Sequence, residues 1–201
     1  MHLILSFNFK TMNHKIILAS NSPRRKELLK GLDIDFEVRI IPDINESYPP
    51  ETAPEDIPSY IARKKADAYK ATIKDDELII TADTVVVLDG DILEKPADKS
   101  DAIQMIKRLS GRKHQVITAV VLTTTEKCKE FAVMSTVDFA ELSDDEIEYY
   151  VERYKPFDKA GSYGIQEWIG YIGVKGIEGS FYNVMGLPVQ RLYHELKSFN
   201  K

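Results

Sequence analysis

Residues 77–93, ELIITADTVVVLDGDIL, constrain the fold more than any other stretch of the chain. The run is apolar and β-branched except at Asp83 and Thr84, which predicts a strand near the centre of a sheet, and Asp89-Gly90 predicts a hairpin turn into a second strand. A carboxylate inside a central strand costs free energy unless something compensates it, and a metal ion or an activated water does so at functional sites. Asp83 could instead mark a strand end or satisfy a turn, so this signal alone leaves both interpretations open.

Strand and helix patterns alternate along the rest of the chain. The spacing of apolar residues predicts strands over 15–20, 35–42, 114–126 and 129–142, and helices over 22–32, 54–73, 98–111, 143–154 and 187–199. The last two strands are expected to be antiparallel neighbours, because the connection between them is short. A glycine-rich stretch precedes the final helix. This order predicts an α/β fold with a mixed, partly antiparallel sheet.

The first predicted helix begins with an unusual charge order. Ser22 suits the N-cap and Pro23 the first helical position, but Arg24, Arg25 and Lys26 follow in the first turn. A helix N-terminus already carries about half a positive charge, so each cation there costs ~0.3–1 kcal/mol. A bound anion would remove the conflict, since free N–H groups, the dipole and arginine side chains all favour phosphate. A solvated basic turn is the alternative interpretation.

Composition excludes several classes of protein. The 201 residues are 43% hydrophobic and carry a net charge of −5, without the basic excess of a general nucleic-acid binder. A single cysteine, Cys128, excludes an internal disulfide framework and a cysteine-rich zinc site, which favours a cytoplasmic protein. No stretch approaches the roughly 18 apolar residues of a membrane span. Residues 1–11 lack a signal-peptide pattern, and we expect a disordered extension there, ahead of Met12.

Further signals are weak when each is taken alone. Lys95, in EKP, could reach a phosphate, although an exposed lysine is the more common explanation. The stretch DKAGSYGIQ, residues 158–166, has two glycines that let a ligand approach the backbone, and Gln166 could bond to a base or a phosphate. Glu46 and Lys65 would ordinarily be solvated surface residues.

Taken together, these motifs resemble a known family. The Maf family of nucleoside triphosphate pyrophosphatases shows the same order of motifs: LASNSPRRKELL, ADTVVV followed by EKP, LSGRKHQVITAV, DKAGSYGIQ and NVMGLPV. The resemblance spans residues 15–195, and the SPRR and DKAGSYGIQ forms look like the subfamily that hydrolyses dTTP and UTP. It implies a two-lobed fold, similar to the inosine-triphosphate pyrophosphatases, with a central cleft in a single catalytic domain over residues 12–201. It also implies a homodimer that needs Mg²⁺, Mn²⁺ or another divalent cation.

The resemblance also implies roles for individual positions. Asp83 matches the residue regarded as the proton acceptor that activates water, and Lys95 matches a basic position beside the triphosphate, so both are expected to be catalytic. Glu46 matches an acidic position that helps to hold the metal together with Asp83. Arg24, Thr84 and Gln166 match positions tied to substrate choice. The full set of expected substrate-binding residues is Ser20, Arg24, Arg25, Lys65, Thr84 and Gln166.

Two positions depart from the family pattern. Asn45 stands before Glu46 where the family often has a second acid, so one possible metal or water contact is neutral here. Glu167 and Trp168 follow YGIQ where small residues are frequent, which bears on nucleotide preference. Trp168 could stack on a base, cap the pocket or pack beneath the cleft.

Two other classes of function stay open. A nucleotide-binding regulator of cell division with little turnover would use the same pocket. Asp83 beside a metal-capable acid argues against it, because binding an anion does not require a carboxylate. A nucleic-acid-binding protein would use the PRRK segment, but the net charge and the lack of interleaved basic and aromatic residues argue against that.

Overall fold

β3, Glu77–Leu88, is the strand around which the sheet is arranged. The computed structural model describes residues 14–199, and in it β3 pairs along one edge with antiparallel β5, Lys113–Thr123. Along the other edge its first residues pair with parallel β1, Lys15–Leu18, and its last residues pair with antiparallel β4, Asp91–Leu93. The apolar run therefore forms a central strand, as its composition predicts.

The remaining strands extend the sheet on both sides. β2, Phe36–Val38, lies parallel to β1, whereas β6, Cys128–Phe139, and β7, Val174–Glu178, continue antiparallel from β5. The seven strands follow the order β2-β1-β3-β5-β6-β7, with β4 beside β3. The predicted α/β fold with a mixed, partly antiparallel sheet is confirmed, and so is the antiparallel pairing of β5 with β6.

Local sequence signals set the ends of several elements. Asp89 and Gly90 have φ angles of 54° and 88°, the left-handed values that a two-residue hairpin turn requires, so the predicted turn is confirmed. Ser143 and Glu146 form a reciprocal capping box at the start of α4, Asp144–Tyr154. These ends follow from short-range chemistry, which is why they could be read from the sequence.

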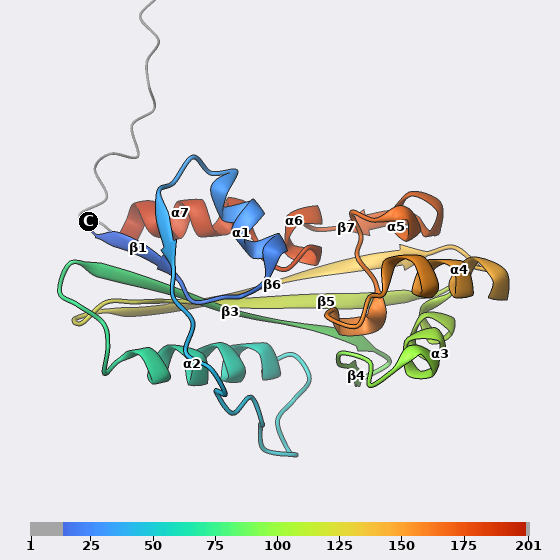
Figure 1. Ribbon diagram of the computed structural model, residues 1–201, viewed down its shortest axis with the longest axis horizontal. Coiled ribbons are helices and arrows are strands. Elements are labelled where there is room, and N and C mark those ends of the chain that lie inside the picture. The colour runs from blue at the N-terminus through green and yellow to red at the C-terminus, as the bar shows by residue number, and fades with distance from the viewer. Residues whose placement is uncertain (1–13, 200–201) are drawn as a thin grey trace, which may run out of the picture.

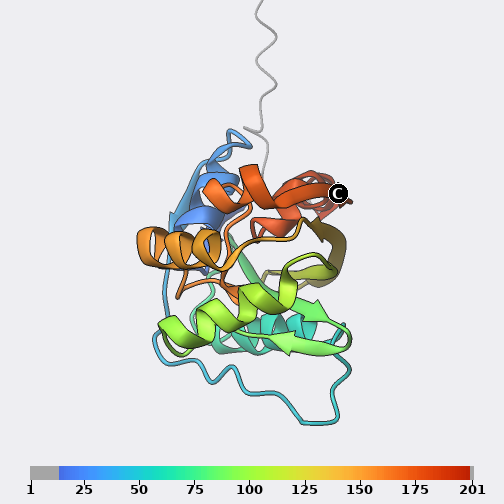
Figure 2. The same cartoon turned by 90° about the vertical axis from the view of Figure 1, so that its right-hand side faces the viewer.

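Helices cover both faces of the sheet (Figure 1). α2, Ile57–Tyr69, packs across β3 and β5 on one face, while α1, Pro23–Lys30, and α7, Val189–Phe199, lie on the other. α3, Lys99–Leu109, packs against α4 at the end of the sheet away from β1 and β2, and Figure 2 looks onto this end. The long strands thus connect two differently covered ends, which form the two lobes that the resemblance implies.

Some elements differ from the sequence prediction. The strand predicted over 35–42 is only the three residues of β2, and α2 is shorter at both ends than the predicted 54–73. The glycine-rich stretch, for which the sequence predicts no helix or strand, contains η2 (Ala160–Ser162), α5 (Trp168–Gly173), β7 and α6 (Phe181–Val184). These pieces depend on tertiary contacts, such as the pairing of β7 with β6, that no local pattern encodes. The extension predicted over residues 1–11 lies outside the described residues.

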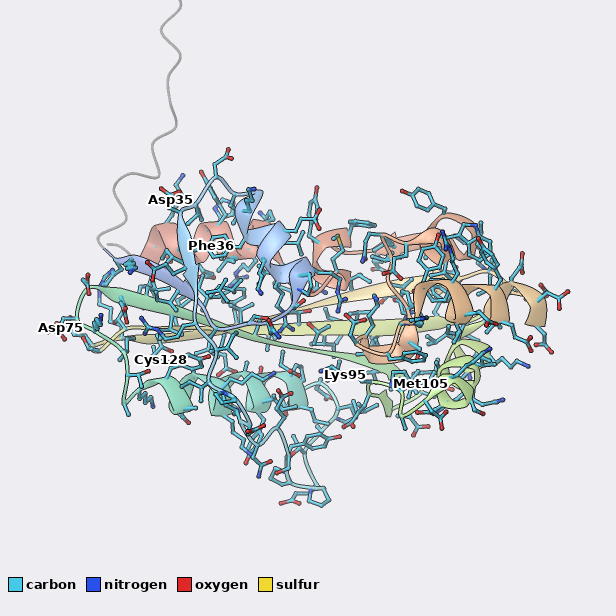
Figure 3. All side chains as sticks on the ribbon, in the orientation of Figure 1. Asp35, Phe36, Asp75, Lys95, Met105 and Cys128 are labelled. Carbon is cyan, nitrogen blue, oxygen red and sulfur yellow. The ribbon has the colours of Figure 1, made fainter. Side chains whose placement is uncertain are left out.

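The structure also bears on two broader expectations. No helix within residues 14–199 is long and apolar enough to cross a membrane. Cys128 is exposed, and Figure 3 shows it near the opposite end of the sheet from Lys95, so its thiol is distant from Lys95.

Candidate active site

A cavity of about 470 Å³ opens where one edge of β3 has no partner strand. β1 pairs with β3 as far as Ile80, and β4 joins only at Val86, so the edge between these two residues is left open. Side chains from both lobes line the cavity, in agreement with the central cleft that the resemblance implies. The charged and amide side chains in its wall include Arg24, Arg25, Glu46, Lys65, Asp83, Lys95, Asp158, Lys159 and Gln166.

Asp83 is the buried carboxylate of this cavity. It lies inside β3 with only 8% of its surface exposed, so the strand-end interpretation is wrong. Its Oδ1 accepts a hydrogen bond from Nζ of Lys65, on α2, at 2.8 Å. The same Nζ lies 3.1 Å from Oε2 of Glu46, so one ammonium group bridges two carboxylates. The ammonium group of Lys65 therefore supplies the positive charge that compensates the buried carboxylate of Asp83.

The surroundings of Asp83 also change its acidity. Burial raises the pKa of the Asp83 carboxyl, because the charged form loses its hydration, while the cations of Lys65 and Arg25 oppose that shift. A carboxylate with a raised pKa accepts a proton more readily than a solvated one. Asp83 can therefore serve as a proton acceptor for a molecule held in the cavity.

Arg25 anchors the start of α1 to distant parts of the chain. Its Nε donates to the carbonyl of Gly186 at 2.8 Å, its Nη1 to the carbonyl of Ala82 at 2.9 Å, and its Nη2 to Oγ1 of Thr84 at 3.0 Å. Burial lowers the pKa of its guanidinium, and the neighbouring Asp83 opposes that shift. Arg25 is thus a structural link as well as a cation in the wall of the cavity.

Arg24 has a simpler environment. Its Nη1 lies 2.7 Å from Oδ2 of Asp158, and 22% of its side chain is exposed. Protein groups therefore partner both arginines of the first turn, so the interpretation as a solvated basic turn is wrong for them. Both arginines of the PRRK segment are thus engaged within the protein, which argues further against a nucleic-acid-binding patch there.

Lys95 lies at the exposed side of the cavity. It follows β4, lines the cavity wall and is exposed, and within residues 14–199 it has no ion pair or hydrogen bond through its side chain. In the view of Figure 3 it lies between α2 and α3. A flexible cation without a protein partner is suited to contact an anion that enters the cleft.

The loop 158–166 forms another part of the cavity wall and is held by charged and hydroxyl groups. Lys159 is only 8% exposed, and its Nζ contacts Oδ1 of Asp158 at 2.9 Å and Oε1 of Glu167 at 3.1 Å. The hydroxyl of Tyr150, on α4, donates to Glu167 and accepts from the backbone N–H of Gly164 at 2.9 Å. These bonds fix the backbone on which Gln166 is carried.

Three residues singled out in the sequence lie elsewhere. Ser20 is buried and accepts a hydrogen bond from the N–H of Ser22 at 3.3 Å, and it is not among the residues that line the cavity. Asn45 accepts from the N–H of Ser47 at 2.8 Å within its own turn. Trp168 packs edge-to-face on Tyr149 with ring centroids 4.9 Å apart, so it packs against α4 and neither caps nor lines the cavity.

Sequence reasoning missed Lys159 and Tyr150. Lys159 follows Asp158 directly, and an adjacent acid–base pair is ordinarily solvated, so no local signal marks it as buried. Tyr150 reads as one more apolar residue on the inner face of α4. Only the packing of α4 against the loop shows that its hydroxyl has a specific partner.

The residues present can accommodate a divalent cation in part. Within residues 14–199 no group of three or more histidine, cysteine, aspartate or glutamate side chains could hold a metal ion. Asp83 and Glu46 nevertheless converge on one point, because both contact Nζ of Lys65. Mg²⁺ commonly binds through one or two carboxylates and completes its shell with water and substrate phosphates, and this pair meets that requirement.

The fold and the cleft together define an α/β protein with a cation-lined cavity that holds one buried carboxylate at the open edge of a mixed sheet. A solved structure of similar fold is that of a HAM1 protein from Coxiella burnetii, which matches with a TM-score of 0.50 and 18% identity, covering 92% of this chain and 99% of that one. At this identity the likeness concerns the fold alone.

The chain belongs to the Maf family: the family model described as Maf-like protein matches residues 15–199. A relative from Phocaeicola vulgatus is 63% identical over 184 residues, which cover 92% of this chain and 95% of the relative. Another, from Parabacteroides distasonis, is 62% identical over 186 residues, covering 92% and 96% of the two chains. Both relatives are named dTTP/UTP pyrophosphatase.

Proposed function

We propose that this protein hydrolyses dTTP and UTP to the nucleoside monophosphate and pyrophosphate. The observation that carries the proposal is the buried Asp83 in a cavity whose wall also holds Arg24, Lys65 and Lys95, because a water-activating base beside several cations suits attack on a polyphosphate. The choice of substrates rests on relatives at 58–63% identity that carry the name dTTP/UTP pyrophosphatase.

In this reaction Asp83 accepts the proton of the attacking water. The water oxygen bonds to the α-phosphorus, and the bond from that phosphorus to the bridging oxygen of the leaving pyrophosphate breaks. The raised pKa of Asp83 favours this proton transfer. Arg24, Lys95 and the positive end of the α1 dipole stabilise the negative charge that collects on the pyrophosphate.

A divalent cation, Mg²⁺ or Mn²⁺, is part of the same proposal, with Asp83 and Glu46 as the residues that hold it. Such an ion neutralises phosphate charge and lowers the pKa of water bound to it. Lys65 keeps the two carboxylates together and compensates their charge when the cleft is empty of substrate. We further place the protein in the cytoplasm as a homodimer; light scattering on the purified chain measures its oligomeric state.

Turnover across nucleotides tests the proposal. The purified protein is incubated with Mg²⁺ and dTTP, UTP, CTP, GTP, ATP or 7-methyl-GTP, and pyrophosphate and orthophosphate are quantified separately. We expect pyrophosphate from dTTP and UTP, and a loss of about 10²–10⁴-fold in kcat for Asp83→Asn, which keeps the shape of the side chain but removes the base. Orthophosphate as the product, or full activity in Asp83→Asn, would contradict the proposal. Tight binding without turnover would favour the regulatory alternative.

A further inference from the structure

A chain of buried polar groups runs from the cavity wall to α6. Oγ1 of Thr84, on β3, lies 2.9 Å from Oγ1 of Thr118, on the neighbouring β5, and Thr118 is completely buried. Oγ1 of Thr118 lies 3.0 Å from the backbone carbonyl oxygen of Asn183. Asn183 is also completely buried, and its side-chain amide donates to the carbonyl of Val116 and to Oγ of Ser135, each at 3.0 Å. This chain is rigid because every member is held on more than one side.

The number of available protons determines the direction of each bond. A threonine hydroxyl has one proton and two lone pairs, whereas a carbonyl oxygen can only accept. Thr118 therefore donates a hydrogen bond to the carbonyl oxygen of Asn183, and it accepts a hydrogen bond from the hydroxyl of Thr84. Oγ1 of Thr84 also accepts from Nη2 of Arg25 at 3.0 Å. The hydroxyl of Thr84 thus donates to Thr118 and accepts from Arg25, and its second lone pair has no partner among these groups.

We propose that Thr118 and Asn183 are positioning residues that leave Thr84 able only to accept a hydrogen bond, so that the cleft selects a nucleobase presenting an N–H there. Thr84 lines the cavity and is only partly buried, and in this proposal its remaining lone pair is directed toward a ligand bound there. Gln166 also lines the cavity, and its buried Oε1 has no hydrogen-bond partner within residues 14–199.

This inference rests on the proposed function and specifies how the substrate is recognised. Thymine and uracil carry an N–H at position 3, where cytosine carries a lone pair. In a cytosine nucleotide the lone pair of N3 would face the lone pair of Thr84. The hydrogen bond is then lost and the two lone pairs repel each other, so cytosine nucleotides are disfavoured. If Thr84 were free to rotate its proton, it could donate to cytosine and this discrimination would disappear.

Binding of nucleotides that cannot be cleaved tests the inference. Calorimetry measures the affinities of α,β-methylene-UTP and α,β-methylene-CTP for the wild-type protein and for Thr118→Val, which removes the hydroxyl and keeps the shape. We expect the wild type to prefer the uracil analogue. This preference should fall by about tenfold in Thr118→Val, because the hydroxyl of Thr84 then has no acceptor on β5 and can turn to donate to cytosine. Thr118→Ser, which keeps the hydroxyl, should keep the preference of the wild type.

A second buried threonine provides a matched control. Thr81 is also completely buried on β3, donates to the carbonyl of Ala62 at 2.8 Å and does not line the cavity. Thr81→Val should therefore lose a comparable buried hydrogen bond and leave the preference unchanged. An unchanged preference in folded Thr118→Val, or an equal loss in Thr81→Val, would overturn the inference.

A measurement on the wild type keeps the inference testable if Thr118→Val does not fold. The α,β-methylene analogue of 3-methyl-UTP lacks the N–H, and we expect it to bind at least about tenfold more weakly than α,β-methylene-UTP. Equal affinity would overturn the inference, as would equal affinity of the wild type for α,β-methylene-UTP and α,β-methylene-CTP. Because these readouts need no cleavage, selective binding without pyrophosphate release would reject the proposed function alone. Pyrophosphate release without selectivity would reject this inference alone.

Discussion

Arg25 donates three hydrogen bonds to groups of the protein, whereas its neighbour Arg24 pairs with Asp158, a carboxylate whose side chain is 55% exposed. Removing the donor to a buried carbonyl costs about 1–3 kcal/mol, because that oxygen is then left unsatisfied. A partly exposed ion pair contributes only about 0–1 kcal/mol, because solvent screens it. Two adjacent residues of the same type therefore have different consequences for stability.

We expect Arg25→Ala to lower the free energy of unfolding by about 2–4 kcal/mol, since the carbonyls of Ala82 and Gly186 lose their donor. Arg24→Ala should lower it by less than about 1 kcal/mol while raising KM and lowering kcat for dTTP. Urea unfolding and steady-state kinetics measure both effects. If Arg24→Ala destabilised the fold with unchanged kinetics, its assignment to the substrate site would be wrong.

At the scale of elements, α4 holds the loop 158–166 in place. The buried hydroxyl of Tyr150 is the link, because it joins the N–H of Gly164 to the carboxylate of Glu167, which in turn contacts Lys159. A Cβ at Gly164 would lie 2.7 Å from the carboxyl carbon of Glu167, so a side chain there would displace the carboxylate that Tyr150 and Lys159 hold. The cavity wall on this side thus depends on an element that contributes no side chain to the cavity itself.

Tyr150→Phe should lower the free energy of unfolding by about 1–3 kcal/mol, because the N–H of Gly164 is left without a partner. It should also raise KM for dTTP, since the loop that carries Gln166 loses its support. Tyr154→Phe is the matched control: Tyr154 stacks on Tyr150 at a centroid distance of 5.1 Å and is 36% exposed. Urea unfolding and kinetics on the two variants would refute this role if their effects were equal.

At the scale of the whole molecule, two buried ionisable groups make stability depend on pH in separate ranges. His114 is 2% exposed among Phe139 and Tyr163, and burial lowers its pKa from 6.5 to about 4. Two N–H groups of the Arg39 guanidinium bond to Glu77 and lower the pKa of that carboxyl to about 2, against an opposing effect of burial. Glu77 therefore stabilises the fold above its ordinary pKa, and this contribution is lost only as pH falls toward 2.

His114 should dominate the change between pH 7 and pH 5. Its folded-state pKa is lowered, so the unfolded chain binds the proton first, and stability falls as pH decreases below about 6.5. We expect a loss of about 2 kcal/mol over this range from this residue. Urea unfolding at pH 7 and pH 5 measures it, with His114→Gln as the variant whose stability should change less with pH. An equal pH dependence in the two proteins would contradict the assignment.

Part of the site could be predicted from the sequence, because its strongest signals are local conflicts. Asp83 in an apolar strand and the arginines at a helix N-terminus each violate a short-range rule, and both lie in the cavity wall. Lys65, Lys95 and Gln166 violate no such rule. Their place in the cavity was expected only from the resemblance to a family, and the structure brings them together there.

By itself the sequence determined the central strand, the hairpin at Asp89-Gly90 and the capped helices, since propensity, periodicity and capping act over a few residues. Only the tertiary structure decided that β3 has an open edge between Ile80 and Val86, that Lys65 reaches Asp83, and that Thr118 lies within hydrogen-bond distance of Thr84. The two side-chain contacts join residues 18 and 34 positions apart in the sequence. The chemistry of the cleft therefore depends on contacts between residues far apart in the sequence, because side chains become buried and hydrogen-bonded to one another only when these segments pack together.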